Sequence, residues 1–226
     1  MATIKTFVLR GFREPVEVTL ASNIMEKQLE AWPAFKNWTS TLRSNLELQY
    51  TEPGHVFNDD PYVLRSITIQ SVDWFGPTKI GFVKLNATIQ NSTGKGFPGV
   101  CFLRGGSVAI LMILRPKDSR DERWVVLTEQ PRVPAGSLKF LEIPTGMIDD
   151  SETFRGAAAE EIEEETGFRI PASELIDLTS LALQRSRMRE LSMQNAMYPS
   201  PGGSDEFMPI FLWERVSLSC REDTLK

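Results

Sequence analysis

The order of apolar and polar residues predicts helices in the N-terminal part of the chain. Between residues 23 and 48, apolar side chains recur at helical spacing at Met25, Leu29, Trp32, Phe35, Trp38 and Leu42. Pro33 has no N–H to donate within a helix, so we expect two short helices that meet at this residue. The apolar face that they share is expected to pack on the core or on a second subunit.

From Leu64 onward the pattern changes to the alternation that is typical of β-strands. Residues 64–76 and 79–90 alternate and contain β-branched side chains, so each is predicted to be a strand. The loop NSTGKGFPG (91–99) contains Gly-Lys, but no glycine stands five positions before Gly94, so the spacing of a phosphate-binding loop fails. We take this loop as a domain boundary between residues 1–96 and 97–226.

In the second part of the chain, predicted strands surround a single strong helix. We expect strands at 107–115, 124–132, 138–146, 174–184 and 207–216. The helix is expected within GAAAEEIEEETGF (156–168), where three alanines favour it and Gly167 ends it. Residues 185–206 are polar and are predicted to form a loop. This order predicts an α+β fold, a mixed α/β sandwich.

Composition and charge exclude several classes of protein. The 226 residues, 41% hydrophobic and 24% charged, are sufficient for one large domain or for a small domain with an extension. The net charge of −5 argues against a nucleic-acid partner. No run of 18 apolar residues occurs, and the N-terminus lacks the apolar core of a secretory signal, so neither a membrane partner nor export is expected.

Cysteine and histidine are scarce, which limits the available chemistry. Cys101 and Cys220 lie far apart and suggest no disulfide framework, so we expect a reducing compartment and a cytoplasmic location. His55 is the single histidine and lies in a turn-like segment. Zinc sites and histidine-dependent nucleophiles are therefore disfavoured. If the chain is an enzyme, carboxylates must do most of the chemistry.

The glutamates of the predicted helix are concentrated on one side. Successive helical residues are rotated by about 100°, so Glu161, Glu164 and Glu165 share one sector roughly 100° wide. Glu160 and Glu163 point elsewhere. Hard divalent cations such as Mg²⁺ or Mn²⁺ would stabilise such a convergent group of carboxylates. The alternative is an acidic helix face that is merely solvated, while Phe154, Ala158 and Ile162 anchor the helix.

Residues 146–168 resemble the Nudix box. The match consists of Gly146, five residues, Glu152, seven residues, and then EEIEEETGF from Glu160 to Phe168. The box arginine is replaced by Glu160. In the family this arginine orients a box carboxylate, so its loss is expected to slow catalysis or to change the metal requirement. A basic residue of the Arg185–Arg189 stretch is a candidate substitute.

The flanks of the box are similar to the ADP-ribose and ADP-sugar pyrophosphatase branch of that family. The matching segments are LTEQPRVPAG, LEIPTGMIDD and YPSPGGSDEFMPIFLW. The resemblance is greatest to plant-type ADP-sugar diphosphatases, with UDP-sugar diphosphatases as near neighbours. It implies a Nudix fold with an N-terminal helical and β extension, and Mg²⁺-dependent hydrolysis of nucleoside diphosphate sugars, ADP-ribose or ADP-glucose preferred. The alternatives are a UDP-sugar diphosphatase, a non-catalytic nucleotide-sugar binder and an interaction protein.

The resemblance also assigns roles to residues of the site. Glu161, Glu164 and Glu165, with the main-chain carbonyl of Thr145, would hold the metal ion, Glu164 being also a catalytic candidate. Glu206 is similar in placement to an acidic residue that acts as general base or metal ligand. Its neighbour Asp205 is the alternative for that role.

Substrate binding and assembly are implied less directly. Arg132 resembles the arginine that meets the diphosphate or the sugar. Trp74 and Phe82 are candidates for stacking on a base, with ordinary packing as the alternative. A homodimer is implied through the N-terminal region. The family continues beyond the last strand, which suggests a C-terminus cut short, and a plastid or mitochondrial location stays open because a transit peptide can have been removed.

Overall fold

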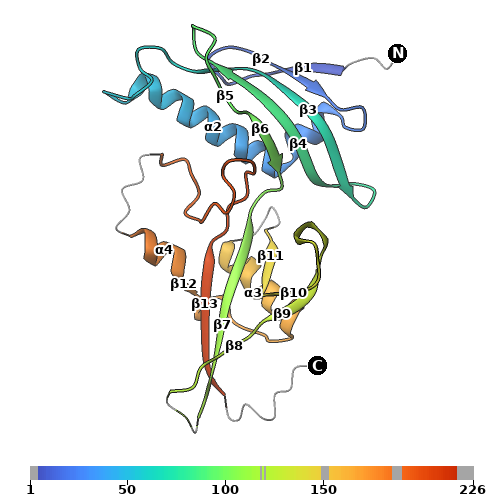
Figure 1. Ribbon diagram of the computed structural model, residues 1–226, viewed down its shortest axis with the longest axis vertical. Coiled ribbons are helices and arrows are strands. Elements are labelled where there is room, and N and C mark those ends of the chain that lie inside the picture. Colours follow the sequence, from blue (N-terminus) through green and yellow to red (C-terminus); the bar gives the residue numbers. More distant parts are fainter. Residues whose placement is uncertain (1–4, 118, 120, 149–152, 185–189, 218–226) are drawn as a thin grey trace. The chain divides into compact units, whose positions relative to one another are not determined.

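The protein is represented by a computed structural model that describes residues 5–117, 119, 121–148, 153–184 and 190–217 (Figure 1). These residues form two compact units. The first comprises the described parts of 1–105, 188–194 and 198–206, and the second comprises those of 106–187, 195–197 and 207–226. Both units contain helices and strands, so the predicted α+β class is confirmed. The domain division predicted at 96–97 stays a prediction.

A mixed sheet and two helices build the first unit. In the sheet, the strand order is β1-β2-β3-β4-β5, with β6 also paired to β4, and only β2 and β3 are parallel. The two strands expected from the alternating pattern are confirmed as β3 and β4. The elements in chain order are β1 (Lys5–Leu9), β2 (Val16–Leu20), α1 (Glu26–Ala31), α2 (Pro33–Thr51), β3 (Val63–Phe75), β4 (Lys79–Gln90), β5 (Gly96–Phe97) and β6 (Val100–Leu103).

The helices of the first unit meet at Pro33, as predicted. This proline occupies the first turn of α2, where its missing N–H costs nothing. α2 is 19 residues long, so the expectation of two short helices is wrong for the second. Leu29 and Phe35 are fully buried among residues of β3 and β4, which shows that the apolar face packs on the core of this unit.

The second unit is built around β7 and α3. Its main sheet has the order β11-β7-β13-β12, with β8 also paired to β7, and β9 and β10 form a separate antiparallel pair. β13 runs parallel to β7. The elements in chain order are β7 (Ser107–Pro116), β8 (Trp124–Val125), β9 (Thr128–Arg132), η1 (Val133–Ala135), β10 (Ser137–Glu142), β11 (Thr145–Met147), α3 (Phe154–Thr166), η2 (Ala172–Glu174), β12 (Ile176–Asp177), α4 (Leu178–Leu183) and β13 (Ile210–Ser217).

Three strand predictions need correction in this unit. Segment 124–132 is two strands, because β8 pairs with β7 whereas β9 leaves it to pair with β10. Segment 138–146 is also two strands, because β10 ends at Glu142 and β11 begins at Thr145. Segment 174–184 is mainly not a strand: the Asp177 carboxylate accepts a hydrogen bond from Ser180 N at 2.8 Å and so begins helix α4. The last strand, expected at 207–216, is confirmed as β13.

Helix α3 is anchored by small and aliphatic side chains. Ala157, Ala158 and Ile162 are buried and belong to the same core as Val108 and Ile110 of β7. This leaves the acidic side of the helix at the edge of that core. None of the helices in the described ranges has the length and apolar character that crossing a bilayer requires.

Candidate active site

The acidic helix α3 has well-defined ends, which fix the directions of its glutamates. Thr153 Oγ1 accepts a hydrogen bond from Gly156 N at 3.1 Å at the first turn. Gly167 adopts the left-handed conformation (φ 74°), and its N–H donates to Glu163 O, so the predicted end of the helix is confirmed.

The glutamates of α3 have different surroundings. Glu161 and Glu165 are half-buried, whereas Glu163 and Glu164 are exposed. Glu163 accepts a hydrogen bond from Arg169 Nε at 2.6 Å, outside the predicted sector. Two members of the predicted acidic sector, Glu161 and Glu165, therefore face the protein, while Glu164 continues the sector toward solvent.

Glu165 is tied to strand β11 and to the β9–β10 pair. Its Oε1 accepts from Gln130 Nε2 at 3.1 Å, and its Oε2 accepts from the main-chain N–H of Thr145 at 3.3 Å. Two donors from different strands orient this carboxylate, and its remaining lone pairs are free to accept further partners.

The register of β11 directs the main chain of Thr145 toward α3. Pro144 O accepts a hydrogen bond from β7, and Ile148 N donates one to the residue just before β7, so these two residues and Gly146 are the hydrogen-bonded positions of the strand pair. In an antiparallel pair the intervening residue points its N–H and C=O away from the partner strand. The carbonyl of Thr145 therefore lies on the side of β11 where its N–H meets Glu165.

Glu161 packs directly against the main chain of Gly146. A Cβ at this glycine would lie 1.6 Å from Glu161 Cδ and 1.7 Å from Oε1, a space that only glycine leaves. Glu161 thus approaches Gly146, and Glu165 approaches the neighbouring residue Thr145, so both glutamates lie against β11. That these two carboxylates hold a metal ion together with the Thr145 carbonyl stays a prediction.

Arg132 joins this group through Glu142, a residue that the sequence analysis missed. Arg132 Nε and Nη2 lie 2.7 and 2.5 Å from Glu142 Oε1, and Gln130 Nε2 donates to the same oxygen at 2.8 Å. Arg132 Nη2 is also 3.5 Å from Thr145 Oγ1. Gln130 and Arg132 are two positions apart on β9 and so share a face; that spacing was the available signal for Gln130.

The oxygen donors of this group have the chemistry that Mg²⁺ prefers. Glu161 and Glu165 supply carboxylate oxygens, and the Thr145 carbonyl supplies a neutral one. Within the described residues, no three His, Cys, Asp or Glu side chains are already arranged as a metal-binding group. Glu152 of the box, the 185–189 stretch suggested to replace the box arginine, and the C-terminal residues 218–226 all lie outside the described residues.

Glu206 and Asp205 belong to the first unit, and each has a distinct partner there. Glu206 Oε1 lies 3.0 Å from Arg104 Nη1. Asp205 accepts hydrogen bonds from the main-chain N–H groups of Arg104 at 2.8 Å and of Gly105 at 3.2 Å. Burial raises the pKa of the Asp205 carboxyl, and these two hydrogen bonds oppose that shift.

The two aromatic candidates lie on opposite faces of the first sheet. Trp74 packs against the core of the unit. Phe82 lies between Phe75 and Phe102, with a ring-centroid distance of 5.0 Å to each. Phe75 and Phe102 are about 40% exposed, so only Phe82 belongs to an aromatic group that reaches the surface. Base stacking by Trp74 or Phe82 stays a prediction.

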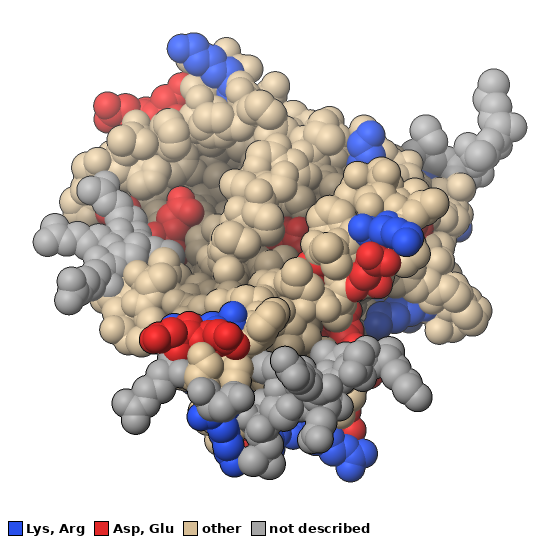
Figure 2. All heavy atoms as spheres, turned by 60° about the horizontal axis from the view of Figure 1, so that its bottom comes forward, with Lys and Arg blue, Asp and Glu red and all other residues tan. Residues whose placement is uncertain are grey.

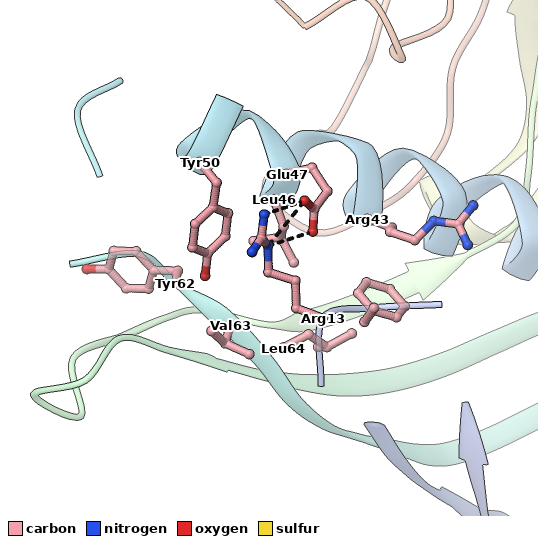
Figure 3. A pocket seen from close by; sticks show the side chains of 9 residues that line it. Arg13, Arg43, Leu46, Glu47, Tyr50, Tyr62, Val63 and Leu64 are labelled. Carbon is pink, nitrogen blue, oxygen red and sulfur yellow. Dashed lines mark hydrogen bonds and ion pairs between the residues drawn. The ribbon is translucent and has the colours of Figure 1, made fainter. Parts of the chain in front are cut away.

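A shallow pocket of the first unit contains none of the predicted site residues (Figure 3). Arg13 lies against the ring of Tyr50 at 3.6 Å and forms a two-pronged ion pair with Glu47. The charges of Arg13 and Glu47 in this pocket thus neutralise each other. On the molecular face shown in Figure 2, acidic and basic side chains are interspersed.

Comparisons with known proteins agree with these features. The NUDIX domain family model matches residues 103–218, more than half of the chain. The chain is 40% identical over 181 residues to "Nudix hydrolase 14, chloroplastic" of Arabidopsis thaliana, covering 79% of this chain and 52% of that protein. It is 31% identical over 113 residues to the "ADP-ribose pyrophosphatase" of Bacillus subtilis (strain 168), covering 50% and 48%. The chain thus spans about half the length of these curated relatives. By the extent of the domain match, it belongs to the Nudix family.

Proposed function

We propose that this protein hydrolyses the diphosphate bond of nucleoside diphosphate sugars with Mg²⁺ or Mn²⁺, giving a nucleoside monophosphate and a sugar phosphate. ADP-ribose and ADP-glucose are the proposed preferred substrates. The observation that supports this most directly is the approach of Glu161 and Glu165 to Thr145 and Gly146, beside Arg132. The similarity to a protein named ADP-ribose pyrophosphatase supports the choice of substrate.

The proposed metal ligands are Glu161, Glu164, Glu165 and the carbonyl of Thr145. When bound, the divalent ion would neutralise diphosphate charge and lower the pKa of a coordinated water. Gln130 and the Thr145 N–H hold Glu165 in one orientation, so this ligand is preorganised by the protein.

Arg132 and Glu206 are the proposed polar partners of substrate and water. The guanidinium of Arg132 is positioned by Glu142 and is about two-fifths exposed, so it has donors available for a diphosphate oxygen. Glu206 is the proposed general base, which accepts the proton of the attacking water, with Glu164 as a second carboxylate of the reaction.

A product-resolved assay tests this proposal. Purified protein is incubated with Mg²⁺ and a panel of ADP-ribose, ADP-glucose and UDP-glucose, and the products are separated by chromatography. Glu164→Gln and Glu165→Gln are expected to lower kcat by about 10²-fold or more, since charged ligands are lost. Glu163→Gln, on the same helix but paired with Arg169, is the matched control and should retain turnover. Wild-type turnover in both site variants would refute the metal-site assignment.

A non-catalytic nucleotide-sugar binder is the second candidate function. It is favoured by one observation: the box arginine is replaced by Glu160, which is exposed on α3. Calorimetry with ADP-ribose in the presence of Mg²⁺ separates the two functions, because a binder would retain the intact ligand without releasing a monophosphate.

Assembly and location are proposed on narrower grounds. We propose a homodimer formed through the N-terminal unit, to be tested by light scattering. For the cellular location, the name "chloroplastic" of the Arabidopsis relative supports the plastid alternative over the cytoplasmic one. Imaging of the full-length protein in its own cells decides between them.

A further inference from the structure

The loop that carries Glu206 is described from residue 190 to residue 206, and helix α2 binds its N-terminal end. Asn45 Nδ2 donates to Glu190 Oε2 at 3.2 Å, and Asn45 Oδ1 accepts from Ser192 Oγ at 2.5 Å. Thr41 Oγ1 is 3.4 Å from Ser192 O. One asparagine of α2 therefore binds two loop residues, one through each end of its amide.

The later end of the loop is attached to β6. Phe102 N donates to Gly203 O at 2.8 Å, and Phe102 pairs in parallel with Ser204. Asp205 then binds the two N–H groups that follow β6, those of Arg104 and Gly105. Asp205 is half-buried, and its carboxylate is used to hold the main chain that follows β6, which is a structural task.

Arg104 contacts both carboxylates of the loop, Asp205 through its main chain and Glu206 through its side chain. Its main chain is bound by Asp205, and its guanidinium pairs with Glu206, whose side chain is only 13% exposed. Arg104 Nε is buried without a hydrogen-bond partner among the described atoms. Unpaired buried donors are rare and need an explanation. Here the guanidinium is oriented by its contact with Glu206 rather than by full satisfaction of its own donors.

We propose that Arg104 is the positioning residue of Glu206 and that Asp205 and Asn45 fix the loop on which Glu206 lies. This inference rests on the proposed function, in which Glu206 is the general base. It assigns the adjacent carboxylates different tasks: Asp205 fastens the loop and Glu206 accepts the proton.

A double-mutant cycle on kcat and KM, with ADP-ribose and Mg²⁺, tests the pairing. Arg104→Met is expected to lower kcat about tenfold with little change in KM, and Arg104→Lys to restore part of the loss. In a Glu206→Gln background, Arg104→Met should cause no further loss, because its effect acts through Glu206. A loss of equal size in both backgrounds, or a rise in KM alone, would show instead that Arg104 binds substrate.

The division of tasks between the two carboxylates is tested by isosteric amides. Asp205→Asn keeps an oxygen that can accept from Arg104 N and is expected to retain kcat within about threefold, whereas Glu206→Gln should lose about 10²-fold or more. The proposal is overturned if Asp205→Asn is as damaging as Glu206→Gln. Arg65→Met, which breaks the Arg65–Glu14 ion pair in the same unit, is the matched control.

Hydrogen exchange gives a readout that does not depend on turnover. The Ser204 and Glu206 N–H groups donate to Ser200 O and Ser204 Oγ. In Arg104→Met and Asn45→Ala these amides should exchange at least about fivefold faster, because fixing contacts are lost. Unchanged exchange would overturn the positioning role even if the wild type hydrolysed every substrate. A wild type without turnover would instead refute the proposed function, and exchange would still decide whether Arg104 fixes the loop.

Discussion

Replacing Gly146 by alanine is a direct test of the site around α3. The new Cβ would lie 1.6 Å from Glu161 Cδ, 1.7 Å from Oε1 and 2.2 Å from Oε2. Gly146 is not among the glycines with positive φ, so alanine can adopt its backbone conformation. The collision is therefore confined to one carboxyl group at the end of a flexible side chain.

The size of the effect follows from the geometry. Non-bonded carbon atoms need about 3.5–4.0 Å, so the Glu161 carboxyl must move by about 2 Å. Because a flexible side chain can make this movement, we expect the free energy of unfolding to change by less than about 1 kcal/mol. A displaced ligand is more serious for catalysis, since an error of about 1 Å at a reacting centre can cost about 10²-fold.

Two measurements check this prediction. In Gly146→Ala, kcat for ADP-ribose should fall about 10²-fold, and the rise in Tm that Mg²⁺ produces by binding the folded state should shrink. In a Glu161→Gln background, Gly146→Ala should lower kcat only a little further. If Gly146→Ala keeps wild-type kcat and the wild-type Mg²⁺ response, the reasoning that places Glu161 at the metal is refuted.

Three further predictions concern other parts of the chain. Gly99→Ala should lower the free energy of unfolding by about 3 kcal/mol in urea titrations, because its Cβ would lie 1.8 Å from a main-chain oxygen of β4, which cannot yield as a side chain can. Asp177→Ala removes the N-terminal cap of α4 and should lower the free energy of unfolding by about 1 kcal/mol in the same assay. Burial raises the pKa of Cys101 to about 12, so in a Cys220→Ser variant at pH 8 only about one thiol in ten thousand is ionised and iodoacetamide should modify the native protein very slowly. Since the unfolded thiol ionises first, this residue's contribution to stability should be complete below pH 9 and fall as the pH rises toward 12.

Features controlled by local chemistry could be predicted from the sequence. The three alanines and Gly167 define α3, and its 100° rotation places Glu161 and Glu165 on one side. Pro33 predicts the junction of α1 and α2 for a similarly local reason. Alternation alone predicts β3 and β4 because each buries one face.

Features that depend on pairing between distant segments could not be predicted in this way. Glu142 meets Arg132 and Gln130 only because β10 pairs with β9, and the strand-like pattern through 138–146 conceals the change of strand. The segment 174–184 has apolar spacings that suit a strand or a helix, and the decisive signal was the cap formed by Asp177 three positions before Ser180. Arg104 lies at the end of a strand, with no pattern that would connect it to Glu206.

Gln130 donates through one nitrogen to both Glu142 and Glu165, and this has a consequence for how the domain can vary. An amide nitrogen has only two hydrogens, and here both are used. If Gln130 exchanged places with Glu142 or with Glu165, two carboxylates would face each other. The base of the β9–β10 hairpin is thereby fastened to the acidic helix. Its tip, Val133–Gly136, lies beyond that fastening and is the place where insertions and substitutions should accumulate without loss of the site.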